Sequence, residues 1–454
     1  MQSSLFSILL FGLLASWAAA APSNIQKRSF KVERVKNANF QGRNGPKELF
    51  KAYRKYSMPV PQGLMDALRN PGSASGAVAV EDVETKAQGS GKGKGKAGKK
   101  AAQGQNNNAA QGTNSSTANA AQQNTTAGVG KVANTPETGD IEYLAPVTIG
   151  GQTVNLDFDS GSSDLWVFNT QLAAQSTTGH TLFDPTKSTT FKMIQGASFS
   201  ISYGDGSGAA GNVGTDTVNI GGATVTKQAI ELATAVSTSF VQDTQNNGLV
   251  GLAFSKLNTV KPQQQKTFFD NVMPSLAEPL FTADLRKNAA GAYEFGRVDT
   301  TKFTGQMAWV PVNTTNGFWQ FATSGFAVGA STSINKTATA QAIADTGTTL
   351  MLVSQATADG YYSQVPGAAN NAQVGGITVP CNATLPDLLV DVGGVYTARV
   401  KGEDINFAQV QGNTCFGGVQ PTTSDLQIWG DIFFKSQFVA FNGGNNSLGM
   451  AQHV

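Results

Sequence analysis

Two short stretches decide the fold of this chain: LDFDSGSS at residues 156–163 and AIADTGTT at residues 342–349. Each places an aspartate, Asp159 or Asp345, after an apolar run and before a hydroxyl residue and a glycine. Glycine permits a tight turn, and nearby hydroxyl groups can orient a carboxylate. Those hydroxyl groups belong to Ser160, Ser162, Thr346 and Thr348. Two carboxylates on facing turns cannot both ionise at short range, so we expect the pair to share a proton and titrate as a unit.

A second repeat predicts that the two stretches lie in related lobes. LVGL at residues 249–252 follows the first aspartate and IWGD at residues 428–431 follows the second, each with a glycine that lets two backbones approach closely. The chain has 454 residues, 51 of them glycine, and only 14% are charged. Short runs rich in Val, Ile, Thr and Phe lie between turn residues, which favours an all-β fold with more than one hydrophobic core.

The net charge of +2 conceals two oppositely charged parts of the chain. Residues 1–127 carry 17 Lys and Arg against 6 Asp and Glu, a formal charge of +11, whereas residues 128–454 carry 15 against 24, a formal charge of −9. A basic arm of this kind is expected to bind an acidic partner, here the rest of the same chain. Nucleic acid is the competing partner, but the basic part contains no recognisable binding module, so we expect no nucleic-acid binding.

The basic part divides into segments of different composition. Residues 1–20 combine an apolar run with a small-residue cleavage site, which is typical of a secretory signal peptide, whereas a membrane anchor would need about 20 apolar residues. Residues 21–127 form a basic segment, within which residues 87–126 are a Gly/Lys-rich and then Gln/Asn-rich linker. We expect a secreted, extracellular protein without a membrane anchor, with lobes at residues 128–304 and 305–454.

Export predicts that Cys381 and Cys415, the only cysteines, form a disulfide, with two free thiols as the alternative. Closing a loop of this length would stabilise the fold by roughly 3 to 4 kcal/mol. A zinc site is not expected, because two cysteines with the distant His180 and His453 give no ligand cluster. Sequons for N-glycans begin at Asn114, Asn124, Asn313, Asn335, Asn382 and Asn445.

The acidic turns and several further motifs together resemble the pepsin-like aspartic endopeptidases, in particular the secreted fungal branch of the penicillopepsin and aspergillopepsin type. The further motifs are DLWV at 164–167, ISYGDGS at 201–207, LNTV at 257–260, TFFD at 267–270 and GDIFFKS at 430–436. The resemblance covers about residues 128–454. It implies a bilobal all-β fold, a double β-barrel or sandwich, whose active cleft lies between two related lobes with Asp159 and Asp345 on its floor.

The resemblance also implies the chemistry. One aspartate would act as general base on a water that attacks the scissile peptide carbonyl, and the other would donate a proton to the carbonyl oxygen. No covalent intermediate, metal or cofactor is implied. The expected substrates are proteins and peptides with hydrophobic residues around the scissile bond, and the enzyme is expected to be a monomer. Ser160 stands where the family more often has Thr, which keeps the hydroxyl group and loses a methyl group.

Further site residues follow from the resemblance by their position. Tyr203 would lie at the tip of a flap hairpin that closes over substrate, with Trp166 as the partner of its hydroxyl group. Phe240 and Leu249 would line the pocket for the residue before the cleaved bond, with ordinary core packing as the alternative. Asp205 would pair with a Lys of the substrate, or else serve only the Asp-Gly turn. The other flap residues are Gly204 and Ser207.

A segment of the basic arm offers an inhibitor for the same site. A short amphipathic helix is expected at residues 46–56, and its last residues, Lys55 and Tyr56, resemble the Lys-Tyr pair of pepsinogen-type propeptides. The resemblance implies that Lys55 lies across the catalytic carboxylates with Tyr56 beside it. Ion pairs would then hold the arm at neutral pH and acid would release it, whereas a role in folding alone is the alternative.

Two other classes of function fit the sequence less well. A Ser-His-Asp hydrolase is suggested by GDGSG at residues 204–208, but residues 128–454 contain only His180 and His453, neither in a supporting motif. A non-catalytic binding protein of the same fold would be favoured by loss of one aspartate. Both aspartates and Tyr203 are present, so the sequence predicts an aspartic endopeptidase made as a zymogen.

Overall fold

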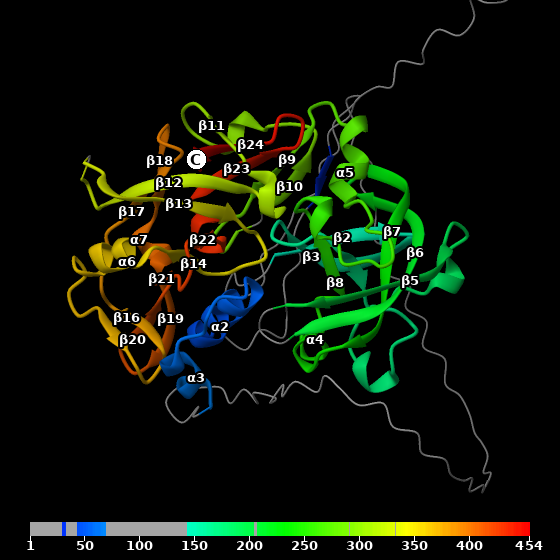
Figure 1. Ribbon diagram of the computed structural model, residues 1–454, viewed down its shortest axis with the longest axis horizontal. Helices are drawn as coiled ribbons and strands as arrows, with labels where there is room; N and C mark the ends of the chain where they lie inside the picture. Colours follow the sequence, from blue (N-terminus) through cyan, green and yellow to red (C-terminus); the bar gives the residue numbers. More distant parts are fainter. Residues whose placement is uncertain (1–29, 33–42, 70–142, 204–206, 290, 332) are drawn as a thin grey trace, which may run out of the picture.

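Strands dominate the computed structural model, which describes residues 30–32, 43–69, 143–203, 207–289, 291–331 and 333–454. Figure 1 shows two β-rich halves side by side, with helices α2 (Gly45–Lys55) and α3 (Gln62–Arg69) lying in front of the second half and reaching toward the first. The predicted all-β, bilobal fold is therefore confirmed. No helix within the described ranges is both long enough and apolar enough to cross a membrane.

Several predictions concern residues that lie outside the described ranges. These are the signal peptide at residues 1–20, the linker at residues 87–126, the flap residues Gly204 and Asp205, and the sequons at Asn114 and Asn124.

A seven-stranded sheet carries the first acidic turn. Its spatial order is β2 (Leu144–Ile149), β3 (Gln152–Asp159), β8 (Gly248–Gly251), β4 (Leu165–Val167), β7 (Ala223–Val236), β6 (Gly208–Ile220) and β5 (Lys192–Ser202). The hairpin of β2 and β3 turns at Gly150 and Gly151, whose φ values of 52° and 83° favour glycine. Strand β3 ends at Asp159, which pairs in parallel register with Gly251 of β8.

A second seven-stranded sheet repeats this arrangement around the other turn. Its spatial order is β18 (Tyr396–Val400), β17 (Leu388–Val392), β12 (Gln320–Val328), β13 (Asn335–Ala344), β22 (Leu426–Trp429), β14 (Met351–Val353) and β21 (Val419–Pro421). Strand β13 ends just before Asp345 and lies parallel to β22. A Cβ atom would lie 2.5 Å from the Asp164 nitrogen at Gly251 and 2.1 Å from the Thr348 oxygen at Gly430. Both repeated glycines therefore permit the close backbone approach that the sequence predicted.

Two smaller sheets complete the strands. One has the order β15 (Ala369–Asn371), β16 (Gly376–Pro380), β20 (Thr414–Gly417) and β19 (Asn406–Gln411). The predicted disulfide between Cys381 and Cys415 is confirmed beside it, with Cα atoms 4.9 Å apart. The other has the order β1 (Phe30–Val32), β10 (Ala292–Phe295), β9 (Leu280–Asp284), β23 (Gln437–Asn442), β24 (Ser447–Gln452) and β11 (Ala308–Pro311). It joins strands from both sides of residue 304, so the lobe boundary expected there stays a prediction.

The helices are short, and several of them pack against strands of the sheets. Besides α2 and α3 they are α4 (Thr238–Gln242), α5 (Phe268–Val272), α6 (Gln355–Tyr362), α7 (Gly402–Ile405) and α8 (Asp431–Phe434). Helix α2 is the amphipathic helix that the sequence predicted: Asn44 caps it by accepting a hydrogen bond from Lys47 N (3.0 Å), and Pro46 stands in its first turn. Its buried Leu49 and Tyr53 join the large hydrophobic cluster that extends through both halves.

Candidate active site

The two acidic turns face each other and are joined by reciprocal hydrogen bonds. Ser160 N donates to Thr346 Oγ1 (3.0 Å), and Thr346 N donates to Ser160 Oγ (2.9 Å). The Ser160 hydroxyl donates in turn to Ala344 O (2.9 Å), and the Thr346 hydroxyl to Phe158 O (2.6 Å). We expected these two hydroxyl groups to orient the carboxylates. Instead, each donates its hydrogen bond to a backbone carbonyl oxygen at the opposite turn.

The other two predicted hydroxyl groups do hold the carboxylates. Ser162 Oγ donates to Asp159 Oδ2 at 2.6 Å, and Thr348 Oγ1 donates to Asp345 Oδ2. The remaining carboxylate oxygens accept from the backbone, since Gly161 N and Gly347 N donate to the Oδ1 atoms of Asp159 and Asp345 at 2.7 Å and 3.0 Å. Each aspartate is thus oriented by its own turn.

The glycine of each turn makes room for the opposite aspartate. A Cβ atom at Gly161 would lie 2.5 Å from Asp345 Oδ1, and one at Gly347 would lie 2.4 Å from Asp159 Oδ1. A larger residue would therefore push the carboxylates apart. The glycines bring together two aspartates that are 1% and 0% exposed.

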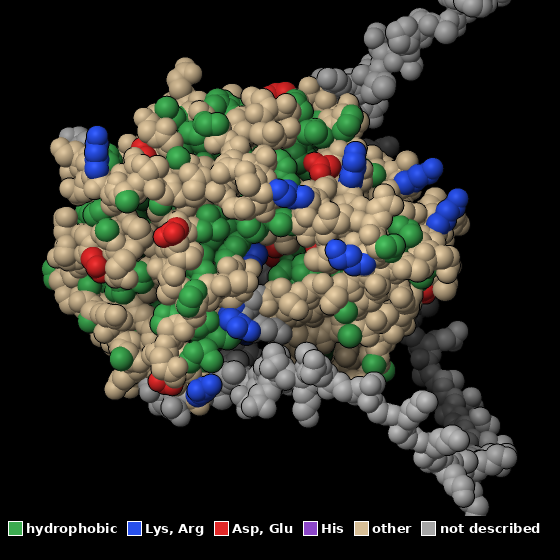
Figure 2. Space-filling view, in the orientation of Figure 1, with side chains coloured by type: hydrophobic (Ala, Val, Ile, Leu, Met, Phe, Trp, Pro, Cys, Tyr) green, Lys and Arg blue, Asp and Glu red, His purple; other side chains and the backbone are tan. Residues whose placement is uncertain are grey.

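Helix α2 delivers a cation and a hydroxyl group to this pair. Lys55 Nζ lies 2.8 Å from Asp159 Oδ1 and 3.1 Å and 3.0 Å from the two oxygens of Asp345. It also donates to Gly347 O at 3.2 Å. Tyr56 OH donates to Asp345 Oδ2 at 2.6 Å. On the face shown in Figure 2, hydrophobic side chains gather between the two halves of the molecule, around the place where α2 lies.

The pKa values of the two carboxyl groups are shifted in opposite directions. Burial raises the pKa of Asp159 to about 6, against the lowering by the Lys55 ammonium and with a further rise from the Asp345 carboxyl group. Burial also acts to raise the pKa of Asp345, but Lys55 and hydrogen bonds to its carboxyl group outweigh burial and hold that pKa below its ordinary value of 3.8. Between these two pKa values, the pair in contact with Lys55 holds one proton.

The predicted flap residues meet in one aromatic cluster. Trp166 Nε1 donates to Tyr203 OH at 2.8 Å, at the end of the β5–β6 hairpin where Tyr203 N donates to Ser207 O (2.8 Å). The Phe240 ring on α4 packs against both, with centroids 4.9 Å from Trp166 and 5.7 Å from Tyr203. Leu249 on β8 pairs with Trp166 in antiparallel register and belongs to the same hydrophobic cluster.

Sequence reasoning missed Glu48, which lies on α2 and reaches the second acidic turn. Thr349 Oγ1 donates to Glu48 Oε2 at 3.1 Å, and the glutamate is 7% exposed. Its position seven residues before Lys55, on the same helix face, was the available signal. Helix α2 therefore contacts the second turn at two places, through Glu48 and through Lys55.

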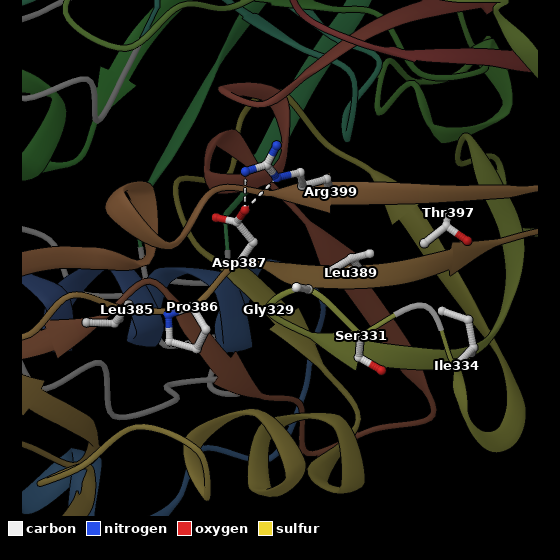
Figure 3. A pocket seen from close by; sticks show the side chains of 10 residues that line it. Gly329, Ser331, Ile334, Leu385, Pro386, Asp387, Leu389, Thr397 and Arg399 are labelled. Carbon is white, nitrogen blue, oxygen red and sulfur yellow. Dashed lines mark hydrogen bonds and ion pairs between the residues drawn. The ribbon is translucent and has the colours of Figure 1, made fainter.

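Other predicted positions lie apart from the aspartates. The sequon residues Asn313, Asn335, Asn382 and Asn445 are exposed on the surface. A separate pocket of about 770 Å³ opens between β17, β18 and the segment that joins β12 to β13 (Figure 3). Arg399 forms an ion pair with Asp387 there, and none of the lining residues is a predicted site residue. Within the described ranges, no group of three or more His, Cys, Asp or Glu side chains could hold a metal ion.

Comparison with known proteins gives matches along almost the whole chain. The model of the eukaryotic aspartyl protease family matches residues 142–453. The chain is 42% identical to aspartic protease PEP3 of Coccidioides posadasii, over 97% of this chain and 94% of the relative. It is 39% identical to endothiapepsin of Cryphonectria parasitica, over 99% and 100%, and 48% identical to aspergillopepsin-1 of Aspergillus oryzae, over 71% and 80%.

Proposed function

The chain belongs to the eukaryotic aspartyl protease family and is an aspartic endopeptidase, and we propose that it is made as a zymogen whose residues 43–69 block the catalytic pair until acid releases them. The contact between Lys55 and both aspartates carries this proposal: its ammonium lies 2.8 Å from Asp159 Oδ1 and 3.0 Å from Asp345 Oδ2. A substrate carbonyl and the attacking water would need the space that Lys55 and Tyr56 fill.

After release, Asp159 and Asp345 would act on a water held between them. The ionised carboxylate would take a proton from the water as it attacks the peptide carbonyl, and the protonated carboxyl group would donate to the carbonyl oxygen. We assign these roles to the pair together, because two coupled groups titrate as one unit. Closure of Tyr203 over the substrate would exclude bulk water from the site.

The pKa shifts indicate when acid would open the site. The pKa of Asp345 is below its ordinary value of 3.8. Its ion pair with Lys55 therefore stabilises the blocked form fully above about pH 3.8, and this stabilisation is lost as the pH falls through the lowered pKa. The net charges of +11 and −9 on residues 1–127 and 128–454 act in the same direction, since acid removes the negative charge of the body.

We further propose a secreted, monomeric enzyme with a broad preference for hydrophobic residues around the scissile bond. The apolar cluster of Trp166, Phe240 and Leu249 beside the flap supports this preference. Cleavage after Lys is a further proposal, which rests on Asp205 in the sequence alone. An Asp205→Ser variant should lose cleavage after Lys and keep cleavage after large apolar residues; unchanged Lys cleavage would remove Asp205 from the proposal.

Acid incubation of the purified full-length chain with a peptide library tests the proposal. We expect no activity near neutral pH, and in acid we expect a shortened protein with activity that a statine-type transition-state analogue abolishes. The library would report specificity in the same experiment. Full activity of the uncut chain at neutral pH would contradict the zymogen, and activity that the analogue does not inhibit would contradict the mechanism.

A further inference from the structure

A second pair of buried carboxyl groups lies behind the first acidic turn. Asp164 follows Asp159 by five residues, and Glu231 lies on β7, where it is in register with Trp166 of β4. Both carboxyl-bearing residues are 1% exposed. The pair therefore connects the turn that carries Asp159 to the strand on which Trp166 rests.

Hydrogen-bond donors hold only one oxygen of each group. Asp164 Oδ1 accepts from Thr259 N (2.9 Å) and Thr259 Oγ1 (2.8 Å). Asn258 Nδ2 bridges the two groups, at 3.2 Å from Asp164 Oδ1 and 3.0 Å from Glu231 Oε1. Within the described part of the chain, Asp164 Oδ2 and Glu231 Oε2 are buried and have no hydrogen-bond partner. A buried carboxylate oxygen without a donor is costly, so these two atoms need an explanation.

The strands around the pair bring other backbone groups and side chains next to it. Glu231 is paired with Trp166 of β4 and Val213 of β6, and the Asp164 carbonyl accepts from Gly251 N of β8 (2.8 Å). Tyr203 is a titratable neighbour, and burial followed by the nearby carboxylates, including that of Asp159, raises its pKa well above the ordinary value, which keeps it neutral. None of the ion pairs among the described residues involves Asp164 or Glu231.

One proton between the two groups would resolve this arrangement. If one group is protonated, its hydroxyl hydrogen bonds to the facing oxygen of the other, and the pair buries a single charge that Thr259 and Asn258 solvate. Burial and the adjacent Asp164 carboxylate raise the pKa of Glu231 well above its ordinary value of 4.5, and burial raises the pKa of Asp164. Both shifts favour retention of the proton.

We infer that Asp164 and Glu231 share one proton and act as a positioning pair, which fixes the Asp159 turn to β7 and supports Trp166, the hydrogen-bond partner of the flap tyrosine. Loss of that proton as the pH rises places two like charges in the core and loosens the turn. The mature enzyme would then inactivate toward neutral pH through this pair, independently of the propeptide. The loss of activity rests on the proposed function; the shared proton does not.

The direction of the pH effect follows from linkage. The folded protein binds this proton more tightly than the unfolded chain does. The stability that the proton confers is therefore complete below the ordinary glutamate pKa of 4.5 and is lost as the pH rises through the raised pKa of the pair. Acid thus stabilises the turn, whereas it breaks the Lys55 contact.

Thermal unfolding of the full-length chain tests the inference. Asp159→Asn and Asp345→Asn together would prevent self-digestion and remove the catalytic carboxyl groups from every titration. In this parent, Glu231→Gln keeps a donor for Asp164 Oδ2 at every pH, and Glu278→Gln, at an exposed position, is the control. We expect Tm to fall less between about pH 4 and about pH 7 in Glu231→Gln than in the parent, by at least roughly 3 °C, with the control unchanged. An equal fall in all three proteins would overturn the inference.

Infrared spectroscopy of the parent protein with Asp159→Asn and Asp345→Asn provides a second test, which does not depend on how the Glu231→Gln variant folds. At about pH 6 we expect a protonated-carboxyl C=O band, which ordinary aspartates and glutamates no longer give at that pH. Its absence in the folded parent would overturn the shared proton. Both readouts use inactive protein, so they remain informative if the proposed activation fails.

Discussion

The two acidic turns have the same internal hydrogen bonds but different supports. In both, a glycine N–H and a hydroxyl group hold the aspartate, and the two turns exchange backbone and hydroxyl bonds. Five residues after Asp159 stands Asp164, which belongs to a buried acid pair, whereas five residues after Asp345 stands Leu350, which is 0% exposed. At this position, therefore, an ionisable residue follows the first turn and an apolar residue follows the second.

Helix α2 also forms different contacts with the two turns. Tyr56 and Glu48 form hydrogen bonds with the second turn, at Asp345 and Thr349, while Lys55 reaches both aspartates. Removal of the helix therefore changes the second turn more than the first. From this comparison we expect the two turns to respond to pH by separate routes, the first through the pair of Asp164 and Glu231 and the second through its contacts with helix α2.

The largest expected effect comes from removing either catalytic carboxylate. Asp159→Asn and Asp345→Asn should each lower kcat by roughly 10⁴-fold or more, because a pair that works as one unit fails when either member is lost. The measurement is peptide hydrolysis in acid, after an active protease has removed the propeptide. Similar losses of kcat in the two variants would show that both aspartates are needed for the reaction, although different residues follow the two turns. Activity retained by either variant would contradict a mechanism that uses both carboxyl groups.

Substitution of Lys55 tests the difference in inhibitor contacts. Lys55→Met leaves two buried carboxyl groups without their cation, and loss of one partner of a buried ion pair costs about 3 to 5 kcal/mol. Because Lys55 is the largest of the contributions that hold the pKa of Asp345 below 3.8, we expect activation to begin at higher pH than in the wild type. The measurement is the fraction of active enzyme after incubation at a series of pH values.

Lys51→Met is the matched control for that experiment, since Lys51 lies on the same helix but its side chain is 41% exposed and forms an ion pair with Glu48. Its activation profile should stay close to that of the wild type. An unchanged midpoint in Lys55→Met would show that the apolar side of α2, and not the ion pair, maintains latency.

The hydroxyl groups that join the turns should have an intermediate effect. Ser160→Ala leaves the buried Thr346 N–H without its acceptor, and Thr346→Ala does the same to Ser160 N–H, so each should cost about 1 to 3 kcal/mol. Urea unfolding of the inactive protein measures both, with the exposed Ser331→Ala as control. A large cost for one variant alone would mean that the reciprocal bonds are not equivalent.

The sequence predicted features that depend on a local motif or on the number of cysteines. It did not predict features that depend on which residue, distant in the sequence, a side chain contacts. The repeated Asp-hydroxyl-Gly stretches predicted two lobes, and two cysteines in a chain expected to be exported predicted one disulfide. The spacing of Ser160 and Ser162 did not tell which hydroxyl binds a carboxylate and which crosses to the other turn. The pairing of Asp164 with Glu231 depends on the parallel register of β4 and β7, which no local pattern encodes.

The smallest expected effect is that of making the two turns alike. Ser160→Thr adds one methyl group at a residue that is 1% exposed, where overpacking could be costly. The equivalent Thr346 is 2% exposed and accommodates its methyl group while making the same reciprocal hydrogen bonds. We therefore expect the free energy of unfolding to change by less than about 1 kcal/mol and kcat to stay the same, as measured by urea unfolding and peptide hydrolysis. A loss as large as that of Ser160→Ala would show that the first turn is packed more tightly than the second, and that its acidic support also restricts the space available to the turn.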